Sequence, residues 1–539
     1  MNSLFSSGMK NVGAPILTGV LVALPYNFPQ LYLLTWFAFV PLLWAVNSSG
    51  LFLSYCKGLI AGLVFYLVAA LWIVDFIRIY KGYEDNLVWL LATVFFIYCA
   101  QLPALLCLLY RYLDKKLLIH PYVLFPSLVV VFYGCYPMLF STQLGESQSH
   151  FLAAIQAIAW TGVSGLDFMI GLSNILIYRT LIFLNKDKIE SVAVYRSEIM
   201  ARVFSLLLFC MWFGYGLYAS QQWREEVAAW PTRNIGFVQP NETPSVNVPP
   251  PAAGYSRAYP PEMEVSEQMA VAQALDIIIW PETRYKGYFA APHVQAAFKH
   301  HIETMAVPII FQDLERVQEQ GKERKYNSAG FINHEGNLDN SYQKIKRVAF
   351  GEYAPFVDYS SALKKWLKAT LGDFYIDMSK GRGPTTFTTN GLTIVPLICY
   401  EVMFSRFVAV ASDYDPEGKL LVALSNNGWF GETRQPYQHL NASVLRAVEN
   451  RLPMVHVVNN GPSAVISPSG RILFQTEYHQ GGGFVAAVPY PEEKPFSFYR
   501  CFPDTFIGGL VALLASILLY RVKRKKYGQL GTEFNNIRG

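Results

Sequence analysis

The sequence predicts a polytopic α-helical membrane domain joined to an α/β domain of layered sheets and helices. Hydrophobic residues make up 52% of the 539 residues and charged residues only 15%, whereas about 25% of an average globular protein is charged. Apolar stretches recur through residues 1–220, and short β-branched runs alternate with helical patterns in residues 221–503. This composition argues against a disordered chain and against a nucleic-acid-binding arm.

Eight apolar stretches are candidates for transmembrane helices, because a bilayer core about 30 Å thick needs about 20 apolar residues. They lie near residues 12–27, 30–46, 58–76, 87–110, 121–140, 162–184, 202–220 and 505–522. The sequence therefore predicts three parts: a membrane domain at 1–220, an α/β domain at 221–503, and a last helix with a basic tail at 504–539.

The basic residues predict the orientation of these helices, because Lys and Arg beside short loops stay in the cytoplasm. Every second connection between the apolar stretches carries an excess of Lys and Arg. The connections on the opposite side have balanced charges or none. The basic set is Lys10, Lys57, Arg111, Lys115, Lys116, Lys186, Lys188, Arg196, Arg521, Lys523, Arg524, Lys525 and Lys526. We therefore expect both termini in the cytoplasm and residues 221–503 on the outer side of a bacterial inner membrane, in the periplasm. No cleavage site follows the first apolar segment, which we interpret as a retained helix.

Four runs in the outer domain are apolar on both faces, as in strands that helices cover. They are residues 234–238, 276–280, 392–398 and 420–424, and helical patterns occupy 262–275 and 436–450. The three prolines at 249–251 predict a loop near the start of this domain.

The cysteines and histidines do not form a metal or disulfide pattern. Five of the seven cysteines lie in apolar stretches, and the nine histidines include no His-x-x-x-His pair. We therefore expect no disulfide framework, no metal and no cofactor.

Three reactive side chains stand where apolar sequence ends: Glu282, Lys344 and Cys399. A thiolate can attack a carbonyl, a carboxylate can accept the thiol proton, and an ammonium can stabilise the oxyanion. The residue types alone leave a second interpretation open. Cys399 can be a small apolar side chain at the end of a core strand, and Glu282 and Lys344 can be surface ion-pair members.

The motifs around these residues occur in an order that resembles the apolipoprotein N-acyltransferases, membrane enzymes of the nitrilase (carbon–nitrogen hydrolase) superfamily. The resemblance extends over nearly the whole chain. Its marks are Trp280-Pro-Glu282, Tyr342-Gln-Lys344, Phe350-Gly-Glu352-Tyr-Ala-Pro355, Ile398-Cys399-Tyr400-Glu401, Ser425-Asn-Asn-Gly-Trp429-Phe-Gly431, Gln438-His439, Arg446-Ala-Val-Glu449-Asn-Arg451 and Asn459-Asn-Gly461-Pro-Ser463.

The resemblance implies an α-β-β-α sandwich for the outer domain and assigns the catalytic roles to Glu282, Lys344 and Cys399. It implies that Glu352 and Glu401 are supporting carboxylates. Glu352 would orient Lys344 or the amine, and Glu401 would either tune Cys399 or hold the strand end. We expect Tyr400 and Trp429 in the pocket wall.

The resemblance also implies the reaction. The acyl donor would be a membrane phospholipid, phosphatidylethanolamine or a similar one. The acceptor would be the α-amine of the N-terminal diacylglyceryl-cysteine of an apolipoprotein, and the sn-1 acyl chain would pass through a Cys399 thioester. We expect a monomer without cofactors. Two alternatives stay open: a membrane amidase or acyltransferase with another acceptor, and a catalytically silent membrane scaffold.

Four positions depart from the usual motifs of the family: Arg347, Ala349, Asn427 and His456. None of the departures removes a catalytic atom. They concern the shape of the pocket and therefore the preferred acyl donor.

Residues 356–374 combine aromatic and aliphatic side chains with Lys364, Lys365 and Lys368, a composition typical of interfacial helices. We predict a mobile lid over the pocket. Its apolar residues include Phe356, Trp366, Leu367 and Phe374. The alternative is a domain-core helix with a solvated basic face.

Overall fold

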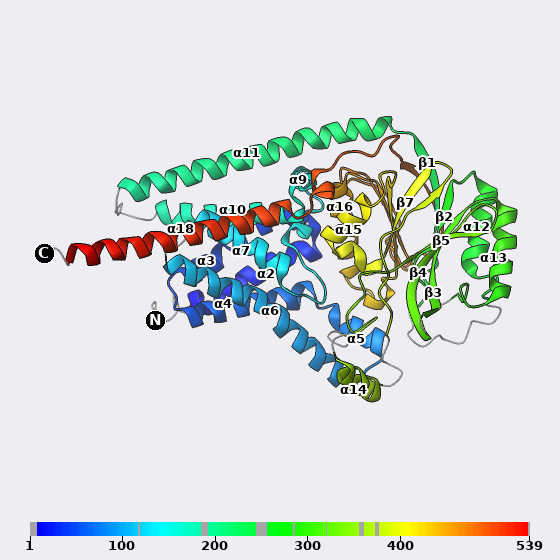
Figure 1. The fold of residues 1–539 in the computed structure, drawn as a ribbon, viewed down its shortest axis with the longest axis horizontal. Helices are drawn as coiled ribbons and strands as arrows, with labels where there is room; N and C mark the ends of the chain where they lie inside the picture. Colours follow the sequence, from blue (N-terminus) through cyan, green and yellow to red (C-terminus); the bar gives the residue numbers. More distant parts are fainter. Residues whose placement is uncertain are drawn as a thin grey trace.

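The computed structural model describes residues 8–116, 119–184, 192–243, 256–283, 286–319, 321–354, 360–371 and 377–536. A bundle of helices forms one end of the molecule and a two-sheet domain forms the other (Figure 1). The prolines at 249–251 and two predicted lid residues, Phe356 and Phe374, lie outside the described residues.

The helical end contains apolar helices near all eight predicted stretches. Its elements are η1 (Met9–Gly13), α2 (Ala14–Asn27), η2 (Pro29–Trp36), α3 (Val40–Asn47), α4 (Leu51–Ala69), α5 (Ile73–Lys81), α6 (Asp85–Lys115), α7 (Pro121–Cys135), η3 (Leu144–Gln148), α8 (Leu152–Ile155), α9 (Ile158–Thr161), α10 (Val163–Leu184), α11 (Val192–Ala229) and α18 (Thr505–Asn536). Among the described residues, five helical segments are long and apolar enough to cross a membrane: Pro29–Asn47, Leu51–Ala69, Asp85–Lys115, Val163–Leu184 and Tyr195–Ala229. This is a helical membrane domain, and the number of eight spans remains a prediction.

The predicted helix at 58–76 differs from the structure. The apolar helix α4 ends at Ala69, and a separate short helix, α5, begins at Ile73. Within α5, Asp75 pairs with Arg78 at 2.9 Å, an ion pair that is costly to place in hydrocarbon. The ring of Phe76 instead stacks on Phe430 of the sheet domain, with 5.2 Å between ring centroids. The segment therefore lies against the sheet domain and does not extend a membrane helix.

Two six-stranded sheets form the other end of the molecule. The first has the order β12-β1-β2-β3-β4-β5 and the second β11-β10-β9-β8-β7-β6. Their strands are β1 (Thr232–Gln239), β2 (Ile277–Ile279), β3 (Ile309–Glu319), β4 (Lys322–Ile332), β5 (Leu338–Gln343), β6 (Phe387–Thr389), β7 (Leu392–Ile398), β8 (Leu420–Ser425), β9 (Met454–Val458), β10 (Ala464–Ile466), β11 (Ile472–Gln475) and β12 (Gly482–Pro489). Within each sheet the central strands β1-β2-β3 and β7-β8-β9 are parallel.

Helices cover the outer faces of both sheets, so the domain is a four-layer α-β-β-α sandwich. The first sheet packs on α12 (Pro261–Ala272) and α13 (Pro292–Met305), and their shared core includes Trp280 and Phe298. An apolar core that includes Phe237 and Ile398 lies between the sheets. The remaining helical elements are α14 (Ser361–Leu371), η6 (Cys399–Met403), α15 (Ser405–Asp413), η7 (Gly428–Phe430), α16 (Gln435–Asn450) and α17 (Phe498–Cys501).

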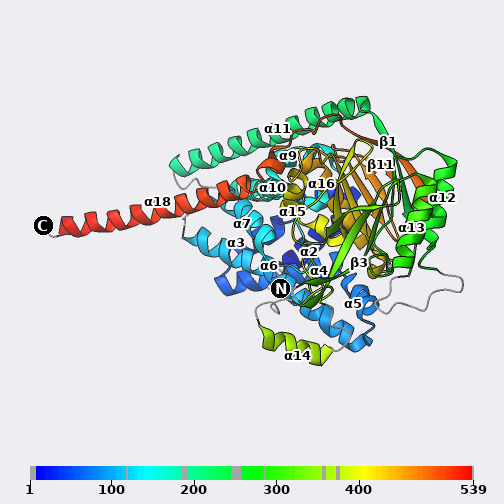
Figure 2. The same ribbon diagram turned by 45° about the vertical axis from the view of Figure 1, so that its right-hand side comes forward.

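The second sheet and its helices α15 and α16 face the membrane helices. One continuous apolar core contains residues of both parts, among them Phe65 and Tyr66 of α4 and Val444 and Leu445 of α16. Figure 2 shows α15 and α16 between the sheets and the bundle. The two parts therefore share a packed interface, and a site at this interface can be reached from both.

Candidate active site

The three predicted catalytic residues meet in one cavity. Glu282 follows β2, Lys344 follows β5, and Cys399 follows β7 as the first residue of η6. All three line a cavity of about 250 Å³. Cys399 has a φ of +50°, in the left-handed region that is rarely occupied by residues other than glycine and that often marks a functional site. The structure therefore brings together side chains that are 117 positions apart in the sequence, from 282 to 399.

The Glu282 carboxyl lies beside the thiol of Cys399, and each group shifts the pKa of the other. Burial raises the pKa of Glu282, and the Lys344 ammonium partly opposes this shift. Burial, followed by the charge of Glu282, raises the pKa of Cys399 to about 12. The thiol therefore keeps its proton at neutral pH, and the adjacent carboxylate, whose basicity is increased, is placed to accept that proton during attack.

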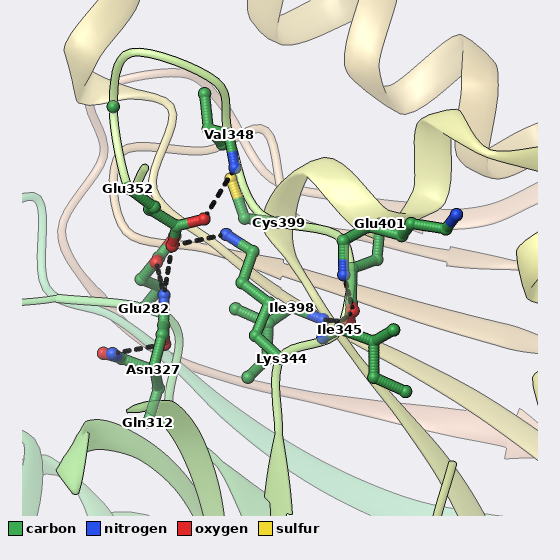
Figure 3. Close-up of polar contacts among 12 residues, drawn as sticks. Glu282, Gln312, Asn327, Lys344, Ile345, Val348, Glu352, Ile398, Cys399 and Glu401 are labelled. Carbon is green, nitrogen blue, oxygen red and sulfur yellow. Dashed lines mark hydrogen bonds and ion pairs between the residues drawn. The ribbon is translucent and has the colours of Figure 1, made fainter. Parts of the chain in front are cut away.

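Lys344 lies between two carboxylates. Its Nζ atom is 2.9 Å from Oε1 of Glu352 (Figure 3), and the residue is only 2% exposed. Burial by itself lowers the pKa of the ammonium, but Glu352 and Glu282 outweigh it and raise the pKa above its ordinary value. The site therefore holds a fixed positive charge, of the kind that stabilises a developing oxyanion.

Asn327 on β4 connects the two carboxylates, and sequence reasoning missed it. Its Nδ2 donates to Oε1 of Glu282 at 2.8 Å and to Oε1 of Glu352 at 2.9 Å. Its Oδ1 accepts from Gln312 Nε2 at 2.8 Å. This amide fixes Glu282 and Glu352 relative to each other, as Figure 3 shows.

Replacing Asn327 with leucine is expected to lower the acylation rate of Cys399 by about 10- to 100-fold. The variant removes two charge-assisted hydrogen bonds, each worth about 1.5–3 kcal/mol, so that Glu282 loses its fixed orientation toward the thiol. The rate of a single turnover measures the effect. Gln343→Leu, which removes an amide that bonds Glu315 outside the catalytic cluster, is the control. Equal rates in Asn327→Leu and the native protein would contradict a positioning role.

Glu401 binds the backbone segments that carry Lys344 and Cys399. The fully buried carboxylate accepts backbone N–H bonds from Ile345 at 2.7 Å, from Lys346 at 3.0 Å and from Ile398 at 2.8 Å. The hydroxyl of Tyr342 donates to both of its oxygens at 2.8 Å. Of the two roles expected for Glu401, this geometry favours holding the strand ends.

Glu401→Gln is expected to lower the free energy of unfolding by about 2–4 kcal/mol. A neutral amide presents an NH₂ group where N–H donors converge, and each buried donor left unsatisfied costs about 1–3 kcal/mol. Chemical denaturation of the purified protein in detergent measures the loss. Glu417→Gln, at a largely exposed carboxylate, is expected to change stability by less than about 0.5 kcal/mol. A stable Glu401→Gln protein would contradict this prediction.

Polar groups from β8 and α16 complete the surroundings of Cys399. The backbone of Asn426 lowers the pKa of the Cys399 thiol, and Nε2 of His439 lies 3.2 Å from the carbonyl oxygen of Cys399. Burial lowers the pKa of His439 to about 4, so the ring is neutral and Nε2–H can donate to that carbonyl. The expected wall residues Tyr400 and Trp429 do line the cavity.

The four departures from the family motifs lie outside the described cavity wall. Oδ1 of Asn427 lies 3.1 Å from Nδ1 of His439, and Nδ1 of His456 lies 3.0 Å from the hydroxyl of Ser443. Arg347 donates to the carbonyl of Met378 at 2.7 Å. Any influence of these residues on the pocket is therefore indirect.

The cavity continues from the catalytic residues to the membrane helices. Aromatic side chains dominate its far wall: Trp72 packs edge-on against Phe140 and Phe430, with 5.0 and 5.3 Å between centroids. Side chains of the helical domain that line it are Tyr26, Phe65, Tyr66, Ala69, Ala70, Trp72, Phe76, Tyr80, Phe140, Ser141, Thr142 and Glu146. An apolar chain bound here could extend from Cys399 to the membrane domain.

The predicted lid falls on α14 and its flanks. Trp366 is 60% exposed, and Lys364 pairs with Asp377 at 2.6 Å. Leu367 belongs to the same helix. In both views α14 lies near α5, which contributes wall residues (Figures 1 and 2). The lid remains a prediction. No group of three or more His, Cys, Asp or Glu side chains in the described ranges is placed to hold a metal ion.

The sandwich, the Glu-Lys-Cys cluster and the helical bundle define the class of the protein: a carbon–nitrogen hydrolase domain attached to a membrane domain. Residues 247–490 match the carbon–nitrogen hydrolase family, and residues 18–176 match the apolipoprotein N-acyltransferase N-terminal domain. The two matches lie in both parts of the chain, which is similar to the apolipoprotein N-acyltransferases over nearly its whole length.

Similarity to individual relatives extends over both parts of the chain. The apolipoprotein N-acyltransferase of Geobacter metallireducens is 29% identical over 532 residues, which cover 95% of each chain. That of Pseudomonas aeruginosa is 32% identical over 254 residues, 45% of this chain and 46% of the relative. Among solved structures, an amidase from Nesterenkonia sp. is 16% identical, with a TM-score of 0.34, over 48% of this chain and 90% of the amidase.

Proposed function

We propose that this protein N-acylates apolipoproteins, moving an acyl chain from a membrane phospholipid to the α-amine of an N-terminal diacylglyceryl-cysteine. One observation carries the proposal: the cavity that contains Glu282, Lys344 and Cys399 is also lined by side chains of the apolar helices. A site for small soluble amides does not need such a wall. A lipid ester does, because its acyl chain must stay out of water while its carbonyl reaches the sulfur.

In the first half-reaction Cys399 attacks the sn-1 ester carbonyl while Glu282 accepts the thiol proton. Lys344 and the backbone N–H of Asn426 stabilise the tetrahedral oxyanion. The C–O bond of the ester breaks, Glu282 returns the proton to the leaving alkoxide, and lysophospholipid departs. The acyl group is then a thioester on Cys399.

In the second half-reaction the α-amine of the acceptor attacks the thioester. Glu282 accepts the amine proton, the C–S bond breaks, and the thiolate of Cys399 regains a proton as the amide forms. Water competes with the amine for the thioester, so an apolar cavity that excludes water favours transfer over hydrolysis. Glu352 would keep Lys344 oriented through both steps.

The setting that we propose follows from the pattern of basic residues. Eight helices would cross a bacterial inner membrane, with both termini in the cytoplasm and residues 221–503 in the periplasm. Phosphatidylethanolamine would be the donor, α14 and its flanks would form the lid, and the protein would act as a monomer. The basic end of the last helix, beginning at Arg521, would then lie at the cytoplasmic surface.

Incubation with radiolabelled phosphatidylethanolamine, without acceptor, tests the function. We expect a stable acyl adduct on the peptide that contains Cys399, and release of the label as an amide when a diacylglyceryl-cysteine peptide is added. Absence of an adduct would favour a silent scaffold. An adduct that is discharged by small amines but not by this peptide would favour the amidase or another acceptor. Complementation of a strain that lacks lipoprotein N-acylation is the cellular counterpart.

A further inference from the structure

Three buried polar side chains in the cavity wall have no part in the reaction described above. They are Tyr66 of α4, Glu146 of η3 and Gln435 of α16, which are 1%, 6% and 7% exposed. In the described structure, the hydroxyl of Tyr66, Oε1 of Glu146 and Oε1 of Gln435 have no hydrogen-bond partner. Oε1 of Gln312, whose Nε2 bonds Asn327, is a fourth unpartnered atom in the same wall. Unsatisfied buried polar atoms are costly, so their number in one cavity wall indicates a ligand.

Contacts between elements connect the parts of the chain that carry these side chains. Helix α16 contacts η3, and α2 contacts both η3 and α4. Tyr66 and Glu146 are close enough for their charges to interact. Gln435 lines the same cavity, together with the aromatic rings of Tyr26, Phe65 and Trp72.

Among the described residues, Glu146 shares its principal counter-charge with another carboxylate. The buried guanidinium of Arg446 lowers the pKa of Glu146 but pairs with Glu449 at 2.8 Å. Asp167, also buried nearby, accepts the N–H of Gly145 at 2.7 Å. The carboxyl groups of Glu146, Asp167 and Glu449 thus lie near a single guanidinium, that of Arg446.

The raised pKa of Glu146 agrees with this excess of carboxyl groups over guanidinium groups. Burial raises it to about 8, Arg446 lowers it in part, and Asp167 and Glu449 raise it further. A cation placed beside Glu146 would restore its ionised form.

We propose that Glu146, Tyr66 and Gln435 form a subsite for a primary ammonium group of a substrate. A carboxylate oxygen, an amide oxygen and a phenolic oxygen are three acceptors, and a primary ammonium has three N–H donors. The aromatic wall adds favourable cation–π contacts. A divalent metal is a poorer occupant, because no group of three His, Cys, Asp or Glu side chains in the described residues is arranged to hold one.

The proposal rests on the proposed function, which supplies two sources of a primary ammonium. One is the ethanolamine headgroup of the phospholipid donor, and the other is the α-amine of the lipoprotein acceptor. The chemistry that the subsite recognises is the same for both, so the experiment must separate them.

Equilibrium binding to the full-length Cys399→Ala protein in detergent tests the subsite without turnover. The donor pair is short-chain phosphatidylethanolamine and phosphatidylglycerol. The acceptor pair is a diacylglyceryl-cysteine peptide with a free or an acetylated amine. We expect Glu146→Gln to weaken binding of one of the two amine ligands by about 10- to 100-fold and to leave its amine-free counterpart unchanged. The affected pair identifies the source.

Two further variants keep the test decisive. Glu198→Gln changes a buried carboxyl on α11 that pairs with Arg202 at 3.2 Å and does not line the cavity, and we expect unchanged binding. Tyr66→Phe removes only a hydroxyl and is expected to weaken the same amine ligand by about 2- to 10-fold, even if Glu146→Gln does not fold.

The subsite is ruled out if Glu146→Gln and Tyr66→Phe both bind all four ligands as the Cys399→Ala protein does. It is also ruled out if these two variants weaken binding of both ligands within each pair equally. The acyl-adduct experiment with native Cys399 tests the proposed function separately. An adduct with no ammonium selectivity overturns the subsite alone. Ammonium selectivity with no adduct overturns the proposed reaction alone.

Discussion

Replacing Cys399 with alanine is expected to abolish the acyl adduct and to lower transfer to the acceptor by about 10⁴-fold or more. Removal of a covalent nucleophile leaves only binding and oxyanion stabilisation, and losses of this size are typical. The neutral thiol, with its pKa raised to about 12, would depend on the neighbouring Glu282 carboxyl to accept its proton. No other cysteine side chain lines the described cavity, so no thiol is in place to substitute.

Single-turnover measurements with labelled phospholipid, followed by mass spectrometry of the acylated peptide, test this prediction. The matched control is Cys501→Ala, at a half-buried cysteine that does not line the cavity, and its rate should equal that of the native protein. Because the φ of Cys399 is +50°, alanine retains the same backbone strain, and stability should change little. A persistent adduct in Cys399→Ala would place the nucleophile elsewhere.

The clustering of Glu282, Lys344 and Cys399 could be predicted from the sequence because each residue stands at the end of an apolar run and within a distinctive motif. Asn327 has neither feature. It lies within β4, a strand whose first residues, Lys322–Lys325, are polar, so no continuous apolar run marks the strand. Its importance depends on pairing between β3 and β4, which places Gln312 opposite Ala329 and close to Asn327. A non-local contact of this kind is absent from local sequence patterns.

The cavity wall beyond the catalytic residues could not be predicted for a related reason. The hydropathy pattern predicted one span over α4 and α5, because Leu71 and Trp72, which lie between the two helices, are apolar. The structure separates the two helices and turns α5 toward the sheet domain, where Phe76 and Tyr80 reach the cavity. Glu146 lies in a short loop element without a motif. Its relevance comes from burial beside α16, which only the packing of the two domains creates.

Lys344→Met is expected to lower the acylation rate of Cys399 by about 1000-fold or more. The substitution removes an oxyanion-stabilising charge, which typically contributes about 100- to 1000-fold. It also removes the cation that lowers the pKa values of Glu282 and Cys399. The pKa of Glu282 therefore rises further, and a larger fraction of this base is protonated at neutral pH. The residual rate should consequently increase with pH over a higher range than in the native protein.

A pH profile of single-turnover acylation separates these two contributions, since loss of the oxyanion contact lowers the rate at every pH and loss of the base shifts the profile upward. Lys57→Met is the matched control: this lysine is also buried and bonds the Ala45 carbonyl at 2.8 Å, but it does not line the cavity. It should affect stability more than the acylation rate. If Lys344→Met kept the native pH profile with only a small loss of rate, Lys344 would hold Glu352 without acting on the chemistry, and the oxyanion would have to be stabilised by backbone groups such as the N–H of Asn426.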